Sequence, residues 1–269
     1  APPAASAELE VDVAYLLNQA KADRNEQVTL TRSAGGSLRV EGVVDTAERK
    51  QEFLRALAPV SNNPAVKIEI RTVAEATTPR RVAAGSLLVE EAEATTNTVA
   101  AEENLRAYFA QQNLSGSMDE AVRSYSSRMV NSSYRALFHA IELKKLMNRF
   151  ANVDMRAVTP DARSKWLAML DQHAAGLERE TATLRQEMQP VFFPQTAAPG
   201  GEEVSIQNDA ELARAVEKLH QMALFNNEAI RSAFTISSHS SVATIKSGQF
   251  RRSLIGVENL AKRIRQYES

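Results

Sequence analysis

The sequence predicts an α+β protein, in which a small helix-strand-strand-helix-strand sandwich precedes a mostly antiparallel α-helical bundle with long helices. Apolar and polar residues alternate in three short runs before residue 75, which is the period of a β-strand. After residue 98 the apolar residues recur in steps of three and four, so they lie along one side of a helix. We therefore predict an α+β domain over 1–75, a linker rich in Thr, Ala, Glu and Pro over 76–98, and a helical bundle domain over 99–269.

The composition of the chain excludes several classes of site. The chain has 269 residues, a net charge of −1 and no cysteine. Without cysteine there are no disulfides, thiolate metal sites or cysteine nucleophiles. The near-neutral charge gives no support to nucleic-acid binding, so we expect no nucleic-acid partner. No run of 18 apolar residues is present, and we expect no membrane-spanning segment in this sequence.

The first helix and a hairpin are expected at the start of the α+β domain. Residues 8–22 carry Leu9, Val13 and Leu17 on one helical face. The apolar period then changes to two over residues 28–31 and 38–44. Gly35-Gly36 lies between these runs and is a turn signal, so the two strands form a hairpin.

A second helix and a third strand complete the predicted sandwich. Asp45 or Thr46 can cap the helix, and Glu48 can close a capping box with Asp45. The helix ends by Pro59, and residues 66–70 then alternate as a strand. This order predicts two helices on one face of a three-stranded sheet.

The segment 38–49, with the sequence LRVEGVVDTAER, resembles part of the BON domain of bacterial envelope proteins. The resemblance covers roughly residues 8–73, where a strand leads through a glycine into a capped, charged helix. It implies a non-catalytic module that touches membranes or partner proteins. More loosely, the unit is similar to the extracytoplasmic region of membrane-bound anti-sigma-factor-like regulators. A ferredoxin-like half of the kind used in secretion rings stays open as an alternative.

Two helices are expected at the start of the bundle domain. The first, over 99–112, carries Leu105, Tyr108 and Phe109. The second, over 119–150, has one apolar row at every seventh residue and a row of smaller residues between its members. Small residues allow a second helix to approach closely. The first row is Val122, Met129, Ala136, Leu143 and Phe150, and the second is Ser126, Ser133, Ala140 and Met147.

Three further helices follow in the prediction. One begins at Thr159-Pro160-Asp161, a cap with proline at the first helical position, and should end before Pro190. The next begins at Asn208 or Asp209, and the stretch 235–248 then blurs the apolar pattern. The seams are Leu170, Leu177 and Leu184 beside Leu167, Ala174, Thr181 and Met188; then Leu212, Val216, Leu219, Ala223, Ile230 and Phe234; and finally Phe250, Leu254, Val257, Ala261 and Ile264.

The histidines give little support to catalysis or metal binding. Glu217 and His220 spell the Glu-x-x-His motif of di-iron bundles once, whereas such a site needs two copies. His239 lies among serines at 237–241, but neighbours in sequence rarely form a nucleophile with its base and oxyanion hole. No phosphate-binding glycine motif occurs. We predict no catalytic residue, no metal ligand and no cofactor.

Two groups of basic residues are candidates for an interaction surface. Arg251, Arg252, Lys262 and Arg263 lie on the last helix, opposite its apolar stripe. Such a helix can bind an acidic partner or an anionic membrane surface, or simply face solvent. Arg39 and Lys67 belong to the polar side of the predicted sheet.

These observations predict a non-enzymatic extracytoplasmic interaction or sensory module of a bacterial envelope or membrane-tethered regulatory protein. A protein partner is expected, with membrane-surface contact as a further candidate. The alternatives are a structural assembly component of an envelope complex, or an enzyme with an unrecognised site at the domain junction. The start at Ala1-Pro2-Pro3 suggests a fragment or processed form of a longer periplasmic or extracytoplasmic protein. The sequence does not reveal the oligomeric state.

Overall fold

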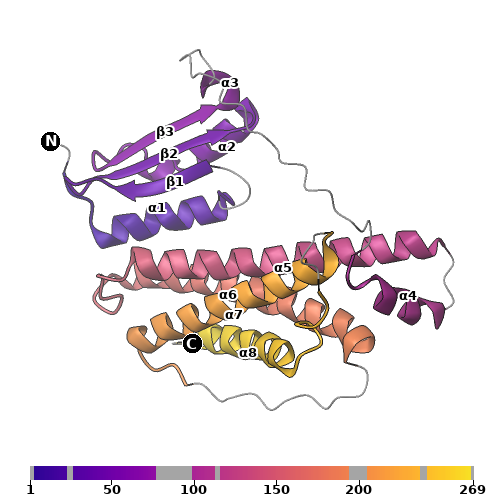
Figure 1. Ribbon diagram of the computed structural model, residues 1–269. Coiled ribbons are helices and arrows are strands. Elements are labelled where there is room, and N and C mark those ends of the chain that lie inside the picture. Colours follow the sequence, from indigo (N-terminus) through magenta and orange to yellow (C-terminus); the bar gives the residue numbers. More distant parts are fainter. Residues whose placement is uncertain are drawn as a thin grey trace. The chain divides into compact units, whose positions relative to one another are not determined.

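The computed structural model describes residues 3–22, 27–76, 99–112, 116–193, 205–236 and 241–267. It confirms the predicted α+β class, with a three-stranded sheet followed by a mostly helical region (Figure 1). The chain falls into two compact units, one made of Ala1–Val89 with Asn152–Met169 and the other of Glu90–Ala151 with Leu170–Ser269. Asn152–Met169, which the sequence placed in the bundle, therefore group with the sheet. Nearly all of the predicted linker 76–98 lies outside the described residues.

The first unit contains the predicted sandwich with its elements in the expected order. Strands β1 and β2 pair antiparallel, while β2 and β3 pair parallel, so the sheet order is β1-β2-β3. A parallel pair needs a crossover connection, which α2 supplies. The elements are α1 (Ala7–Gln19), β1 (Gln27–Arg32), β2 (Leu38–Val44), α2 (Ala47–Ala56), the 3₁₀ turn η1 (Ala58–Val60), β3 (Val66–Thr72) and α3 (Val73–Ala76).

The core of this unit lies between the sheet and the two longer helices. Side chains from both helices and from alternate positions of the strands form a single apolar cluster. Because alternate strand residues point to the same face, both helices cover one side of the sheet, as predicted. Members of the cluster include Val13, Leu17, Leu30, Leu38, Val40, Val44, Phe53, Leu57 and Ile70.

Side-chain caps begin both helices of the first unit. Ser6 Oγ accepts a hydrogen bond from Leu9 N at the start of α1. Thr46 Oγ1 accepts one from Arg49 N at the start of α2, over 3.2 Å, so Thr46 rather than Asp45 is the N-cap. These hydroxyl oxygens satisfy backbone donors that have no partner within the helix.

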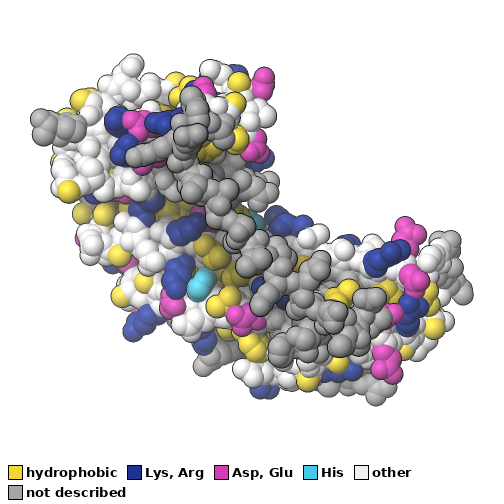
Figure 2. All heavy atoms as spheres, turned by 45° about the horizontal axis from the view of Figure 1, so that its top comes forward, with side chains coloured by type: hydrophobic (Ala, Val, Ile, Leu, Met, Phe, Trp, Pro, Cys, Tyr) yellow, Lys and Arg dark blue, Asp and Glu magenta, His cyan; other side chains and the backbone are white. Residues whose placement is uncertain are grey.

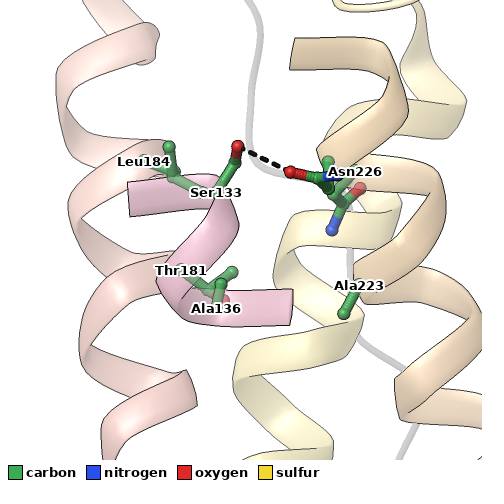
Figure 3. A pocket seen from close by; sticks show the side chains of 7 residues that line it. Ser133, Ala136, Thr181, Leu184, Ala223 and Asn226 are labelled. Carbon is green, nitrogen blue, oxygen red and sulfur yellow. Dashed lines mark hydrogen bonds between the residues drawn. The ribbon is translucent and has the colours of Figure 1, made fainter. Parts of the chain in front are cut away.

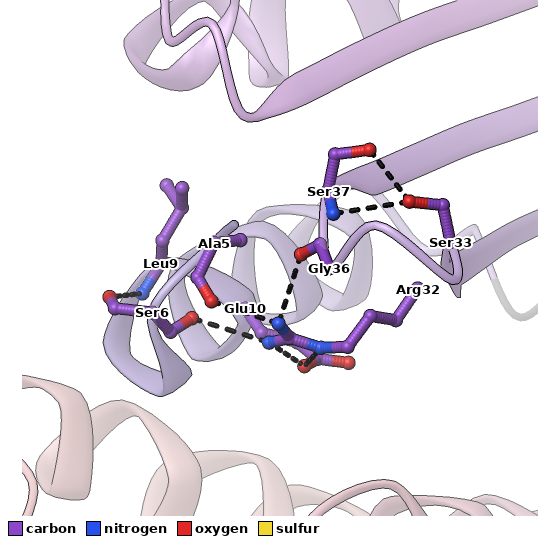
Figure 4. A network of polar contacts seen from close by, with 8 residues as sticks. All are labelled: Ala5, Ser6, Leu9, Glu10, Arg32, Ser33, Gly36 and Ser37. Atoms are coloured by element: carbon purple, nitrogen blue, oxygen red, sulfur yellow. Dashed lines mark hydrogen bonds and ion pairs between the residues drawn. The ribbon is translucent and has the colours of Figure 1, made fainter. Parts of the chain in front are cut away.

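Arg32 ties the start of the chain to the hairpin (Figure 4). Its guanidinium donates to Glu10 Oε2 over 2.6 Å, to Ala5 O over 2.8 Å and to Gly36 O over 3.0 Å. Ala5 N also donates to Gly36 O. Gly36 has φ of 82° and a Cβ there would lie 2.8 Å from Ala4 Cβ, so the turn requires glycine. This network fixes α1 against the strands.

The second unit is a bundle of amphipathic helices (Figure 1). Helices α5 and α7 lie side by side, as do α7 and α8. The helices are α4 (Glu102–Ala110), α5 (Met118–Arg149), α6 (Pro160–Phe192), α7 (Asp209–Phe234) and α8 (Gly248–Arg265). The first turns of α6, up to Met169, belong to the first unit.

Burial confirms the seams predicted for the long helices, except at Met147 and Leu167, which are half-buried. On α5 the whole apolar row from Val122 to Phe150 is buried, and so are Ser126, Ser133 and Ala140 of the small row. On α6 Leu170, Leu177 and Leu184 are 1%, 0% and 1% exposed. The predicted seams of α7 and α8 are buried throughout.

The predicted end of α6 before Pro190 is wrong, because the helix continues to Phe192. Pro190 has no N–H, so it removes only one hydrogen bond, and it removes it in the last turn. Phe193 N donates to Gln189 O, and Gln189 Nε2 donates to Phe193 O. Phe192 and Phe193 are buried in the main apolar cluster of the bundle, and this packing favours the longer helix.

That cluster joins five elements of the second unit around aromatic rings. Tyr125 and Phe192 each contact Phe234, and Phe193 stacks on Phe250.

Among the helices that the structure describes, none combines the length and apolar character needed to span a bilayer.

Candidate functional site

The strands of the first unit present a polar face on the side away from α1 and α2. We define this polar sheet face by the outward side chains of Thr29, Thr31, Arg39, Glu41, Lys67, Glu69 and Arg71. Their strand register places Glu41 between Thr29 and Glu69, and Arg39 between Thr31 and Lys67. Basic and acidic side chains alternate along β2 and along β3. Figure 2 shows Lys and Arg side chains interspersed with Asp and Glu side chains on the surface.

Glu69 holds two cations on this face in fixed positions. Its Oε2 accepts from Arg39 Nη2 over 2.6 Å, and its Oε1 lies 2.7 Å from Lys67 Nζ. Arg39 also lies 2.8 Å from Glu41 Oε1. The hydrogen bonds from Lys67 and then from Arg39 lower the pKa of Glu69 to about 2. Glu69 is therefore ionised at neutral pH.

The basic residues predicted on α8 do not form one surface. Arg251 is 7% exposed and its guanidinium lies over the ring of Phe193 at 5.7 Å. The prediction that Arg251 faces a partner is therefore wrong, because it packs inside the unit as a cation–π contact. Arg252, one residue further along the helix, is exposed.

Arg265 and Lys262 of α8 lie beside carboxylates of α6. Arg265 donates to Asp171 Oδ1 and Glu178 Oε2, each over 2.9 Å, and these hydrogen bonds raise the pKa of Arg265. Lys262 lies 3.9 Å from Glu178. Arg263 is exposed and donates to Gln266 over 3.2 Å. Pairing with α6 weakens the case for an anionic membrane as the partner of this helix.

Glu217 and His220 meet Lys144 of α5 rather than a second histidine. Lys144 Nζ lies 2.9 Å from Glu217 Oε2 and 3.5 Å from His220 Nδ1. The hydrogen bond from Lys144 lowers the pKa of Glu217, while burial and then Lys144 lower that of His220. Across the described ranges, no group of three His, Cys, Asp or Glu side chains is placed to hold a metal ion.

His139 of α5 and His173 of α6 form a pair that the sequence analysis did not find. Their Nδ1 atoms are 3.2 Å apart, so one ring donates to the other. His173 is 4% exposed, and Gly176 leaves room for the ring of His139. Each histidine precedes a member of a predicted seam, Ala140 or Ala174, and that position could have indicated the contact. His239, which the sequence analysis also considered, lies outside the described residues.

A small cavity lined by both polar and apolar side chains lies among α5, α6 and α7 (Figure 3). Its volume is about 10 Å³. Ser133 Oγ donates to Asn227 Oδ1 over 3.0 Å beside it, while Asn226 Oδ1 is buried without a hydrogen-bond partner. The lining residues are Ser133, Ala136, Thr181, Leu184, Ala223, Asn226 and Asn227.

Comparison with known proteins gave no match to a protein-family model, to a curated protein or to a solved structure. The resemblance of residues 38–49 to the BON domain therefore stays a prediction.

Proposed function

We propose that this chain is a non-enzymatic interaction module of a bacterial envelope or membrane-tethered regulatory protein. It binds a protein partner through the polar sheet face. The observation that carries the proposal is Glu69, which fixes Arg39 and Lys67 on neighbouring strands. The envelope location rests on the BON-like segment 38–49.

Two physical arguments support a binding role for this face. Side chains that are already held in place lose less conformational entropy on binding. Opposite charges in a fixed order also select a partner with the complementary order and repel others. Exposed ion pairs such as those of Glu69 contribute little to folding stability, so recognition is the better reason for the arrangement.

A site-specific photo-crosslinker tests the proposal in cells that express the full protein. The crosslinker replaces Thr31 on the polar sheet face or Arg55, an exposed residue of α2, as the matched control. We expect one discrete adduct with a different protein from position 31 and none from position 55. Equal adducts at both positions, or no adduct at position 31, would contradict the proposal.

A charge variant then tests the role of Glu69. Glu69→Gln removes the carboxylate that holds Arg39 and Lys67, and we expect it to remove the adduct at position 31. Glu52→Gln is the control, because Glu52 is an exposed carboxylate of α2 paired with Arg49. An adduct with twice the mass of the chain would instead favour the structural assembly alternative.

A further inference from the structure

The cavity among α5, α6 and α7 has the size and chemistry of a site for one water molecule. A buried water needs a cavity of roughly 10–15 Å³ and two to four polar partners. The cavity has about 10 Å³ and is lined by polar side chains from all three helices (Figure 3). Ser133, Thr181, Asn226 and Asn227 are 1%, 1%, 4% and 3% exposed.

The hydrogen bonds around the cavity are incomplete within the protein. Ser133 Oγ lies 2.8 Å from Val130 O and 3.0 Å from Asn227 Oδ1, but its hydroxyl has one hydrogen for these two acceptors. Asn226 Oδ1 has no donor at all among the described residues. Buried polar atoms are nearly always satisfied by protein or by ordered water.

We propose that the cavity binds one water molecule, which donates a hydrogen bond to Asn226 Oδ1, and that this hydrated layer sets the register of the three helices. Water fits better than a cation, because all seven lining residues are uncharged and a cation would have no opposing charge there. Ser133 and Thr181 occupy positions of the predicted seams and place buried hydroxyls there.

The register argument follows from the seven-residue repeat. Apolar layers that repeat every seven residues resemble one another, so apolar side chains alone specify the register of the helices weakly. Such a slide of α7 would place Leu219 or Ala233 where Asn226 now lies. A slide of α6 would place Ala174 or Met188 at the position of Thr181. Either slide would leave buried polar groups facing apolar ones. A single polar residue in the core of a coiled coil specifies the register for the same reason.

Oxygen-17 relaxation dispersion of the full chain tests the water, since it counts water molecules held inside a protein. Asn226→Leu should lower the count by one, and Asn131→Leu, at an exposed position of α5, should leave it unchanged. If Asn226→Leu does not fold, Thr181→Val removes a lining hydroxyl at nearly constant shape and should give the same loss. An unchanged count in a folded variant would overturn the proposal. If sodium chloride raises the melting temperature more than choline chloride does, the cavity binds a cation and not a water molecule.

Spin-label distances test the register. The chain has no cysteine, so Ser127→Cys on α5 and Gln221→Cys on α7 place labels at two exposed positions only. We expect one distance in the otherwise unchanged protein. Asn226→Leu should add a second population shifted by about 10 Å, the length of seven helical residues. A single unchanged distance in that variant would show that the polar layer does not set the register.

Discussion

Replacing Gly176 of α6 by alanine should destabilise the bundle, although alanine is the better helix former. A Cβ at position 176 would lie 2.5 Å from His139 Cε1 and 2.7 Å from His139 Cδ2. The imidazole of His139 must therefore press against the new methyl group or turn away from it. If it turns away, it loses the 3.2 Å contact with Nδ1 of His173, which is 4% exposed.

The magnitudes decide the sign of this effect. Alanine in place of a helical glycine gains about 0.5–1 kcal/mol. Overpacking costs about 1–3 kcal/mol, and breaking the hydrogen bond between His139 and the buried His173 costs about 1–3 kcal/mol. The two costs are alternatives, because the ring either stays or turns. We expect a net loss of about 1–2 kcal/mol in the free energy of unfolding.

Urea unfolding followed by circular dichroism measures this loss as a lower transition midpoint at unchanged slope. The control is the same substitution in a His139→Ala background, where the ring is absent. There Gly176→Ala should stabilise by about 0.5–1 kcal/mol, the helix propensity alone. A higher midpoint for Gly176→Ala in the presence of His139 would refute the close contact.

The other predictions concern the seams, the network at the hairpin and the polar sheet face. Leu177→Ala removes a side chain that is 0% exposed and should cost about 2–5 kcal/mol in denaturant melts; a loss below about half a kcal/mol would exclude this seam. Ala140→Leu overfills a site that is also 0% exposed and should cost about 1–3 kcal/mol, whereas unchanged stability would mean that the small row tolerates bulk. Arg32→Ala should lower the free energy of unfolding by about 1–3 kcal/mol, because Glu10 loses a charged donor. Calorimetry should show that Arg32→Lys loses less stability than Arg32→Ala but does not reach that of the unchanged protein. The low pKa of Glu69 means that its contribution to stability is present above pH 4.5 and disappears as the pH falls towards 2. Because exposed ion pairs are screened by solvent, Glu69→Gln should remove only a small part of the pH dependence of the melting temperature in that window. An NMR titration in which the Glu69 carboxylate has a pKa of about 4.5 would contradict the two ion pairs.

The sequence predicts those features that repeat regularly. The seven-residue rows of α5 and α6, the alternation of the strands and the cap at Thr46 all follow from local periods and local chemistry. Pro190 misled the prediction because a single lost hydrogen bond counts for less than the burial of Phe192 and Phe193.

The candidate sites depended on contacts between helices that are distant in sequence. His139 and His173 are separated by 34 positions, and their places beside the seams were the only local sign of the contact. The charge of Arg251 led us to predict a surface position. Its contact with the ring of Phe193 joins α8 to the residue after α6 and has no signal in the sequence. Ser133 and Thr181 lay in the predicted seams, but only packing against α7 brought them to Asn226 and Asn227.

The mixed sheet also has a consequence for the order of folding. The hairpin pairs β1 with β2 across a short turn, Arg32 opposite Leu38, whereas β3 meets β2 only after the chain has closed a loop from Leu38 to Val66. Closing the longer loop costs more chain entropy, so the hairpin forms early and β3 joins late. Lys67 and Glu69 lie on β3 and Arg39 lies on β2, so Arg39 can pair with Glu69 only after β3 has joined β2. The surface proposed to recognise a partner is thus complete only when β3 has paired with β2, and a chain that has formed the hairpin alone cannot present it.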